Sequence, residues 1–307
     1  MVDVAVLGGG PAGATAAARL AADGFVVVVV DPLGIGGALI NVDHLPDHPD
    51  HPEGIAGWDL AAVLGERALA AGATVTMGRA GTPTWAHGTW TVPVESDRDG
   101  LQARAVLVAT GCRPRPLPGD ADGSLEGRGV SYCAVCDGGL FAGRSVVVVG
   151  DGPVAFAEAR TLAETAAAVT VVVAGPEPVA DPSWVAAAVA AGPVTVLTGQ
   201  PVTGVTMADD GRGVTGVETA SGAAIAAGGV FGALDPVPNS EPVAALVDLD
   251  PDGRLPVDHH FAVHGAPAGL FAAGDVRRGT GARAAAAEAD GAQAAAAVAA
   301  FLQRAGL

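Results

Sequence analysis

The chain has 307 residues, of which 50% are apolar and 16% charged, so its length suits about two domains and its composition excludes global disorder. Its 16 basic residues are all arginine and are outnumbered by 33 acidic residues, giving a net charge of −17 that disfavours nucleic acid and anionic lipid as partners. The absence of lysine excludes Schiff-base and P-loop lysine chemistry.

No membrane segment or secretory signal is predicted. Residues 1–10 lack a basic leader and are typical of a β-strand followed by a glycine turn. The alanine-rich tail comes nearest to a membrane helix, but Glu288, Asp290 and Gln293 interrupt it before it reaches the roughly 18 apolar residues required. We therefore expect a soluble, cytoplasmic protein.

The first part of the chain predicts a strand, a glycine turn, a helix and a second strand. The two strands and the turn are residues 2–7, residues 25–31 and Gly8–Gly13. Gly8 permits a sharp turn, Gly10 lets backbone amides approach a pyrophosphate, and Gly13 lets the helix pack on the strand. Asp31 follows Gly8 by 23 residues, which is near the spacing of an acid that binds adenosine ribose hydroxyls. The pattern predicts a dinucleotide site.

A second unit of the same kind is predicted from residue 145, with Gly150 and Gly152 in its turn. Its second strand ends at residues 174–175 with neither a ribose-binding acid nor an arginine for a 2′-phosphate. Residues 161–211 contain no arginine, lysine or histidine. Because arginine binds phosphate dianions best, the sequence disfavours NADPH, although an arginine from elsewhere in the chain could reach this site.

Proline- and glycine-rich stretches at residues 112–129 and 235–242 mark the joints between the two units. We predict an α/β fold of two Rossmann-like domains, each a three-layer ββα arrangement, with the second domain inserted into the first. The expected limits are residues 1–115 and 242–307 for the split first domain and residues 116–241 for the inserted domain.

Two of the three cysteines have the spacing C-x-x-C, at Cys133 and Cys136, and Asp137 follows directly. This spacing allows a reducible disulfide and a nucleophilic thiolate, whereas two buried structural thiols are the alternative. No metal is expected, since zinc needs four ligands and only the isolated Cys112 remains, which we interpret as a small buried residue without a catalytic role. Asp137 is either a turn residue or a carboxylate that moves the proton of thiol–disulfide exchange.

A series of motifs along the chain carries a resemblance to a known family. They are GGGPAG (8–13), GGAL (36–39), PEGIAG (52–57), VATG (108–111), SYCAVCDG (131–138), PNS (238–240) and LFAAGD (270–275). With these motifs over nearly its whole length, the chain resembles the low-molecular-weight thioredoxin reductase family of flavoproteins. The resemblance implies a homodimer that binds FAD in the split domain.

The resemblance also implies roles for individual residues. Cys136 would face the flavin, Cys133 would attack the substrate disulfide, and Asp137 would be the acid/base. Asp31 would bind the ribose and Asp275 the ribityl chain. The residues assigned to FAD are Gly8, Gly10, Pro11, Ala12, Gly13, Asp31, Gly37, Ala38, Leu39, Asn41, Asp47, Ala109, Thr110, Gly111, Gly274, Asp275, Arg283 and Ala284.

The chain departs from the family pattern at several positions. Ala38 and Ala284 stand where the family has glutamine, and Asp47 aligns with an asparagine of the flavin loop. The basic segment that usually binds the nucleotide phosphate is replaced by AGPEP at residues 174–178.

Three histidines, His44, His48 and His51, occur in the flavin loop, where an aromatic residue is more usual at the middle position. One interpretation is that they are solvated side chains of a proline-rich loop. The other is that they handle protons or tune the edge of the flavin.

We predict an FAD-dependent thiol–disulfide oxidoreductase that exchanges two electrons between flavin and substrate through Cys133 and Cys136, with NADPH disfavoured. One alternative is a dithiol oxidase that passes electrons from a small dithiol to O₂ and releases H₂O₂. Another is a thioredoxin reductase fed by NADPH or ferredoxin. The expected partner is a small dithiol or disulfide, or a thioredoxin-like protein. The intact C-x-x-C-D sequence disfavours a redox-silent FAD-binding protein.

Overall fold

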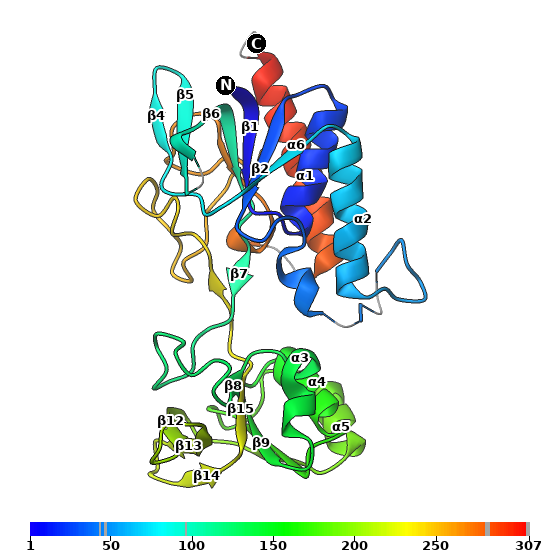
Figure 1. Cartoon of the computed structure of the whole chain (residues 1–307), viewed down its shortest axis with the longest axis vertical. Coiled ribbons are helices and arrows are strands. Elements are labelled where there is room, and N and C mark those ends of the chain that lie inside the picture. Colours follow the sequence, from blue (N-terminus) through cyan, green and yellow to red (C-terminus); the bar gives the residue numbers. More distant parts are fainter. Residues whose placement is uncertain (43, 46–47, 96, 280–282, 305–307) are drawn as a thin grey trace. The chain divides into compact units, whose positions relative to one another are not determined.

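The chain forms two compact units (Figure 1). The computed structural model describes all residues except 43, 46–47, 96, 280–282 and 305–307. The first unit comprises Met1–Arg113 and Val237–Leu307, and the second unit comprises Pro114–Pro236. The chain therefore leaves the first unit once and returns to it once.

The joints between the units lie beside a short pair of strands. Strand β7 (Cys112–Arg113) pairs antiparallel with β16 (Val237–Pro238), and both belong to the first unit. The second unit consequently begins two residues before, and ends five residues before, the insert expected at 116–241. Proline-rich composition indicated the region of the joints, whereas the strand pairing fixes where they fall.

A largely parallel sheet forms the centre of the first unit. Its strands, in spatial order, are β3 (Thr74–Met77), β2 (Val27–Asp31), β1 (Val2–Leu7) and β6 (Asp97–Val108), then β5 (Thr89–Val94) and β4 (Thr84–Ala86), with β17 (Leu270–Ala272) also on β6. Strands β4 and β5 are antiparallel to their neighbours. The valine-rich runs of β1 and β2 are covered on both faces, which explains why these two strands are apolar rather than alternating.

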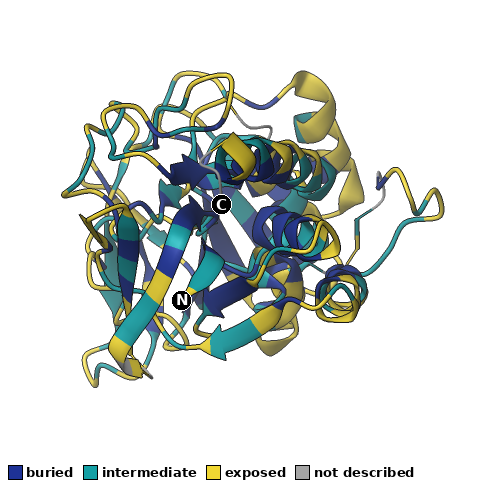
Figure 2. Cartoon of the chain, turned by 90° about the horizontal axis from the view of Figure 1, so that it is seen from above, coloured by how far each residue is buried: buried dark blue, intermediate teal, exposed yellow. Residues whose placement is uncertain are grey.

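Helices α1 (Pro11–Ala22), α2 (Gly57–Ala70) and α6 (Ala284–Arg304) lie on one side of this sheet (Figure 1). Helix α1 begins at Pro11, inside the glycine turn, so the turn supplies the first helical residues. Small residues let α1 and α6 approach closely, since a Cβ on Gly291 would lie 2.1 Å from the Ala12 carbonyl oxygen. Buried residues gather on the strands and on the helix faces that meet them, and exposed residues on the loops (Figure 2).

The second unit repeats the design with a five-stranded parallel sheet. Its order is β11 (Val194–Leu197), β10 (Ala168–Val172), β9 (Ser145–Val149), β15 (Gly229–Gly232) and β8 (Val130–Ser131). Its helices are α3 (Ala134–Asp137), α4 (Pro153–Leu162) and α5 (Pro182–Ala191), and a second sheet is β12 (Val202–Met207), β13 (Val214–Thr219) and β14 (Ala224–Ala226).

The valines of β9 alternate between two layers of the second unit. Val146 and Val148 pack with α4 and α5, whereas Val147 and Val149 pack with β13. The arrangement of helices, sheet and second sheet is the predicted α/β class. Three short 3₁₀ helices complete the elements that the structure describes: Gly37–Asn41, Gly138–Phe141 and Gly274–Val276. Among the described residues, no helix combines the length and apolarity needed to cross a bilayer.

A pair of glycine substitutions tests the close packing at α1. A Cβ on Gly13 would lie 2.0 Å from the Gly8 carbonyl oxygen, so we expect Gly13→Ala to lower the free energy of unfolding by about 2 kcal/mol or more. Gly65, inside α2, has room for a Cβ 3.7 Å from Ile35, so we expect Gly65→Ala to raise it by about 0.5–1 kcal/mol. Urea unfolding followed by circular dichroism measures both, and equal stability of the two variants would contradict the packing.

Candidate functional site

The predicted dinucleotide turn lies at the carboxyl end of β1. Gly8 has φ +106°, and a Cβ there would lie 2.4 Å from the Ala109 carbonyl oxygen, so glycine is required at this position. The Gly9 amide donates to Asp31 Oδ2 at 2.8 Å, which ties the acid to the turn. Gly10 is the N-cap of α1 and supplies no side-chain cap to the amides of the first helical turn. These amides are the donors that a pyrophosphate would use.

The structure brings most of the residues assigned to FAD together around this turn. Gly37 lies against Gly10, because a Cβ on Gly37 would be 2.8 Å from the Gly10 Cα. In the same way, Gly274 lies against Ala12, with 2.8 Å between a Cβ on Gly274 and the Ala12 Cβ. Asn41 ends the 3₁₀ helix that begins at Gly37, and Asp47 lies outside the described residues.

A cavity of about 480 Å³ opens beside these residues within the first unit. Six of the residues assigned to FAD line it, namely Pro11, Ala38, Leu39, Asp275, Arg283 and Ala284. The other lining residues are Val42, Leu45, His48, Pro49, Ala285 and Ala287. Asp275 Oδ1 is buried and accepts no hydrogen bond from the described residues. A buried carboxylate oxygen needs a donor, which a ligand hydroxyl in the cavity would supply.

A buried ion pair supports the backbone of Gly274 and Asp275. Asp290, 6% exposed, accepts from the Gly274 amide at 2.6 Å and pairs with the guanidinium of Arg277. The Asp275 carbonyl oxygen accepts from Arg254 and from Cys112 Sγ. Sequence reasoning missed the supporting roles of Asp290, Arg277 and Arg254, and noted Asp290 only as an interruption of the apolar tail.

Cys112 is partly buried rather than fully buried. Burial raises the pKa of its thiol, and the nearby Arg254 offsets part of this rise. The thiol donates to the Asp275 carbonyl oxygen at 3.3 Å, which makes it a support of the cavity wall.

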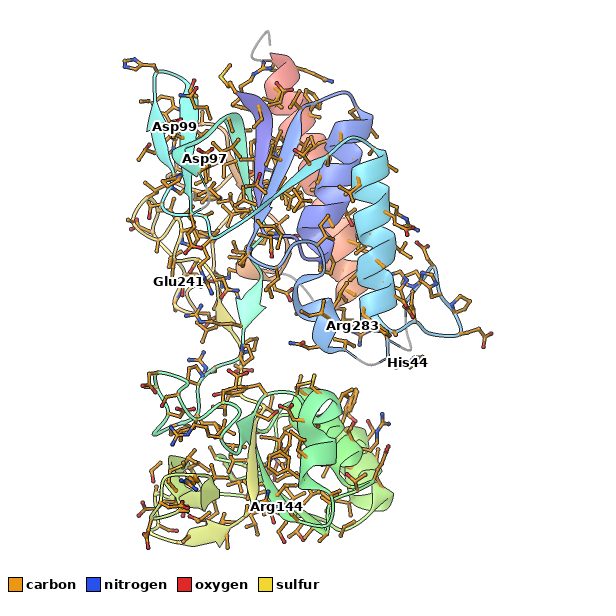
Figure 3. All side chains as sticks on the ribbon, in the orientation of Figure 1. His44, Asp97, Asp99, Arg144, Glu241 and Arg283 are labelled. Carbon is orange, nitrogen blue, oxygen red and sulfur yellow. A yellow bond between two sulfur atoms is a disulfide. The ribbon has the colours of Figure 1, made fainter. Side chains whose placement is uncertain are left out.

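The three histidines of the loop before α2 have different environments. His48 is 6% exposed and lines the cavity, with Nε2 2.8 Å from Glu288 Oε1 and Nδ1 accepting from the Asp50 amide. The solvated-loop interpretation is therefore wrong for His48. The ring of His51 lies 5.2 Å from that of His48, whereas His44 is exposed. His44 and Arg283 lie on the segments that precede α2 and α6 (Figure 3).

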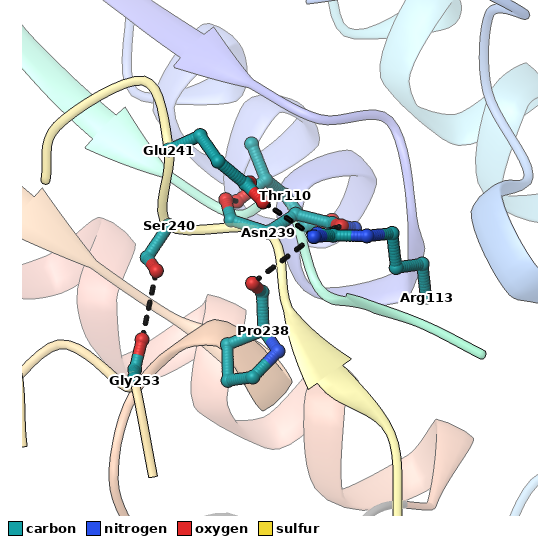
Figure 4. A network of polar contacts seen from close by, with 7 residues as sticks. All are labelled: Thr110, Arg113, Pro238, Asn239, Ser240, Glu241 and Gly253. Atoms are coloured by element: carbon teal, nitrogen blue, oxygen red, sulfur yellow. Dashed lines mark hydrogen bonds and ion pairs between the residues drawn. The ribbon is translucent and has the colours of Figure 1, made fainter. Parts of the chain in front are cut away.

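Thr110, assigned to FAD, takes part in a polar network beside the β7–β16 pair (Figure 4). Its hydroxyl donates to the Asn239 carbonyl oxygen at 2.6 Å, and Asn239 Nδ2 donates back to the Thr110 carbonyl oxygen at 2.9 Å. Arg113 donates to Asn239 Oδ1 at 2.8 Å and pairs with Glu241 at 2.6 Å. Asn239 of the PNS motif is thus the centre of a hydrogen-bond network that joins the segments of β7 and β16.

Cys133 and Cys136 form a disulfide in the second unit, at the beginning of α3. Cys136 is exposed and Cys133 is partly exposed, so the disulfide is open to a reaction partner. Ser131 Oγ donates to Asp137 Oδ2 at 2.7 Å and accepts from the Cys133 amide at 3.1 Å. Asp137 is therefore hydrogen-bonded through Ser131 to the backbone of the cysteine pair. No cluster that could hold a metal ion occurs in the described part of the chain.

Glu158 on α4 also contacts the cysteine segment, and sequence reasoning missed it. Its Oε2 accepts from the Ala134 amide, one residue after Cys133. Burial raises the pKa of Glu158 from 4.5 to about 7, and the Ala134 hydrogen bond opposes part of that rise. An acid three residues after Ala155 on a helix face that is otherwise apolar was the available signal.

The second glycine turn is present at the end of β9. A Cβ on Gly150 would lie 2.2 Å from the Ala233 carbonyl oxygen, and Gly152 is the N-cap of α4. The turn also contains Asp151, whose carbonyl oxygen accepts from the Ala180 amide. Strand β10 leads into residues 173–178, where Glu177 is the charged residue.

Comparison with known proteins agrees with this geometry. The family described as pyridine nucleotide-disulphide oxidoreductase matches residues 2–291. The chain is 34% identical to a thioredoxin reductase from Mycolicibacterium smegmatis over 283 residues, which covers 89% of this chain and 88% of that protein. It is 32% identical to a bifunctional thioredoxin reductase/thioredoxin from Mycobacterium leprae, where the match covers 89% of this chain and 60% of the longer relative.

Among solved structures, thioredoxin reductase from Lactococcus lactis in the FR conformation aligns with a TM-score of 0.89 at 27% identity, covering 99% of this chain and 100% of that one. Thioredoxin reductase from T. acidophilum aligns with a TM-score of 0.86 at 27% identity, covering 99% of both chains. The chain therefore belongs to the pyridine nucleotide-disulphide oxidoreductase family. Within it, this chain is a thioredoxin reductase-like, FAD-dependent disulfide oxidoreductase. The family resemblance, the fold class and FAD as cofactor are confirmed.

The first unit fits FAD on structural grounds. The turn at Gly8–Gly13 offers amide donors without an intervening side chain, and Asp275, whose Oδ1 has no donor among the described residues, lines the cavity. The cavity wall is mainly apolar, with Ala38, Leu39 and Ala284 among its members, as suits the face of a flavin ring.

Removing Asp290 tests the support of the cavity. Asp290→Ala leaves the Gly274 amide and the Arg277 guanidinium without their shared acceptor, so we expect a loss of about 3 kcal/mol in the free energy of unfolding. We also expect FAD to dissociate at least tenfold more readily, as measured by the fluorescence of released FAD. The exposed Asp252→Ala is the control. Unchanged FAD retention in Asp290→Ala would refute the supporting role.

Glu158 also predicts a pH dependence of stability. Because its pKa is raised from 4.5 to about 7, the folded chain binds more protons than the unfolded chain between these values, so stability falls as the pH rises through this window. Glu158→Gln cannot ionise and removes this loss. We expect the variant to match the wild type at pH 4.5 and to exceed it by on the order of 2–3 kcal/mol at pH 8 in urea unfolding. Glu164→Gln, exposed just after α4, should show the wild-type pH dependence.

Proposed function

We propose that the enzyme exchanges two electrons between FAD and a substrate disulfide or dithiol through Cys133 and Cys136, without using NADPH. The observation that carries the second half of this proposal is the absence of any arginine, lysine or histidine from residues 161–211. This range includes the end of β10 and the residues after it, where a doubly wound domain meets the adenosine ribose and its 2′-phosphate.

The charges around the second glycine turn support the same conclusion. Asp151 lies within the turn, and Glu177 follows β10, so a dianionic phosphate would meet two acids there. Three arginines of the second unit are engaged with other groups. Arg115 donates to the Asp235 carbonyl oxygen, Arg128 donates to the Gly211 carbonyl oxygen, and Arg144 lies over the Phe141 ring.

The disulfide segment supports the roles proposed for its residues. When bound, FAD supplies reversible two-electron chemistry. Cys133, whose amide donates to the buried Ser131 Oγ, is the proposed nucleophile toward substrate, and the exposed Cys136 is the residue proposed to face the flavin. Asp137, held by Ser131 Oγ at 2.7 Å, is the proposed acid/base that carries a proton to and from the thiols. The residues assigned to FAD around Gly8–Gly13 and Asp275 remain part of this proposal.

Relatives of this chain are named thioredoxin reductases, which supports a thioredoxin-like protein or a small disulfide as the oxidised partner. A second candidate is a dithiol oxidase, in which a small dithiol reduces the Cys133–Cys136 disulfide. The electrons then reduce O₂, which is released as H₂O₂. Asp151 in the second glycine turn and Glu177 after β10 favour the oxidase, because they disfavour binding of NADPH, the alternative electron donor. A ferredoxin-fed reductase is the third candidate. We also propose a homodimer that acts in the cytoplasm.

Anaerobic reduction of the yellow protein decides between these candidates. We expect NADPH and NADH to leave the flavin absorbance unchanged over minutes, and a small dithiol to bleach it. Peroxide formed when air is admitted to the dithiol-reduced protein would select the oxidase, and its absence would select a reductase with another donor. Rapid bleaching by NADPH would overturn the proposal on the donor.

The same experiment with Cys136→Ser tests the electron path. We expect the variant to retain FAD and its melting temperature but to lose bleaching by the dithiol. The matched control is Cys112→Ser, which lies in the first unit outside the C-x-x-C pair and whose hydroxyl can still donate to the Asp275 carbonyl oxygen. Persistent bleaching in Cys136→Ser would exclude the disulfide from the path.

A further inference from the structure

Helix α4 lies beside α3 within the second unit (Figure 1), and Glu158 of α4 reaches the cysteine segment through its contact with the Ala134 amide. Its neighbours on α4, Ala155, Ala159 and Leu162, are fully buried and pack in one cluster with Ala134 of α3. A carboxylate among these apolar residues loses hydration, so its burial costs free energy unless a hydrogen bond compensates for the loss. The hydrogen bond from the Ala134 amide is the polar contact that α3 offers it.

Two carboxylates are therefore linked by hydrogen bonds to the backbone amides of Cys133 and Ala134. The amide of Cys133 reaches Asp137 through Ser131 Oγ, and the next amide, that of Ala134, reaches Glu158 directly. The two acids differ in environment. Asp137 belongs to the cysteine segment itself, whereas Glu158 is provided by a separate helix whose buried face holds it in place.

The charges near Glu158 are few. On α4 itself, Arg160 and, just beyond the helix, Glu164 are exposed. On α3 the charged group is Asp137, and neither the 3₁₀ helix Gly138–Phe141 nor α5 has a charged residue. Within the described residues, no ion pair includes Glu158. Because Glu158 accepts from the amide next to Cys133, it contacts the backbone beside the residue that becomes charged when the disulfide is reduced.

We propose that Glu158 and the Cys133 thiol share one proton in the reduced enzyme, so that Glu158 sets the pH at which Cys133 becomes the attacking thiolate. This inference deepens the proposed function and rests on its assignment of Cys133 as the nucleophile. A charged Glu158, bound to the amide next to Cys133, and a thiolate on Cys133 would repel each other, so loss of the proton from one group raises the proton affinity of the other. The burial that brings the pKa of Glu158 to about 7 keeps the exchange near neutral pH.

The reaction balances with this proton held on Glu158. The proton passes from Cys133 Sγ to the carboxylate, and the thiolate attacks one sulfur of the substrate disulfide, breaking its S–S bond. The displaced substrate thiolate takes up that proton from Glu158. Cys136 then attacks Cys133 Sγ, which restores the Cys133–Cys136 disulfide, and the Cys136 proton passes through Asp137 to the second substrate sulfur, which leaves as a thiol. The enzyme dithiol is oxidised by two electrons, the substrate disulfide is reduced by two, and both thiol protons end on substrate.

Alkylation of Cys133 tests the shared proton without any electron donor. FAD-loaded protein with Cys136→Ser is treated with iodoacetamide between pH 5.5 and 9, and modification of Cys133 is followed by peptide mass spectrometry, separately from Cys112. Adding Glu158→Gln should leave the rate at pH 5.5 unchanged and raise it about tenfold at pH 8, because the charge opposing the thiolate is gone. Adding Glu164→Gln should leave the whole profile unchanged.

Coincident profiles for Glu158→Gln and its parent would overturn the proposal, and so would an equal shift in Glu164→Gln. Should Glu158→Gln fail to retain FAD, Glu158→Asp replaces it. The shorter side chain withdraws the charge from Ala134, so we expect about a threefold rise at pH 8, and an unchanged profile would again refute the shared proton. Bleaching by NADPH would overturn the proposal that the enzyme does not use NADPH, but it would not change the alkylation rates of Cys133. Failure of the proposed function and failure of the shared proton are therefore distinguishable.

Discussion

The first unit depends on a steric constraint: backbone atoms of neighbouring elements meet where no Cβ fits between them. A Cβ on Gly8 would clash with Ala109, just after β6, one on Gly13 would clash with Gly8, and one on Gly291 would clash with Ala12 of α1. These three contacts bring the amino end of α1 to the carboxyl edge of the sheet. The cavity beside that edge, with Asp275 and Ala284 in its wall, follows from the contacts.

The sequence predicted the parts of the fold that repeat. Runs of valine marked β1, β2 and β9, and glycine turns marked the passage from strand to helix in both units. The start of α1 was placed too late because Pro11 was counted with the turn, although proline suits the first helical position. Strands β7 and β16 were not predicted, since two residues each are too short to carry a period.

The candidate site was predicted where backbone motifs define it and missed where side chains complete it. The order of the glycine motifs located the residues that gather around Gly10. Glu288 and Asp290 lie on the alanine-rich α6 and Glu158 lies on α4, and their partners come from other segments of the chain. Only tertiary structure pairs Glu288 with a histidine 240 residues away, and the burial of His48 could not be seen in a loop rich in proline and acid.

The pairing of β7 with β16 has a consequence for modularity. Neighbouring antiparallel strands keep opposed Cα atoms about 5 Å apart, so the chain leaves and re-enters the first unit at almost one point. A two-residue bridge from Arg113 to Val237 could close that gap. The polar network formed by Asn239, Arg113 and Glu241 would remain intact. The second unit is therefore a self-contained insertion, so recombination could replace it with another domain while the first unit remains one continuous chain.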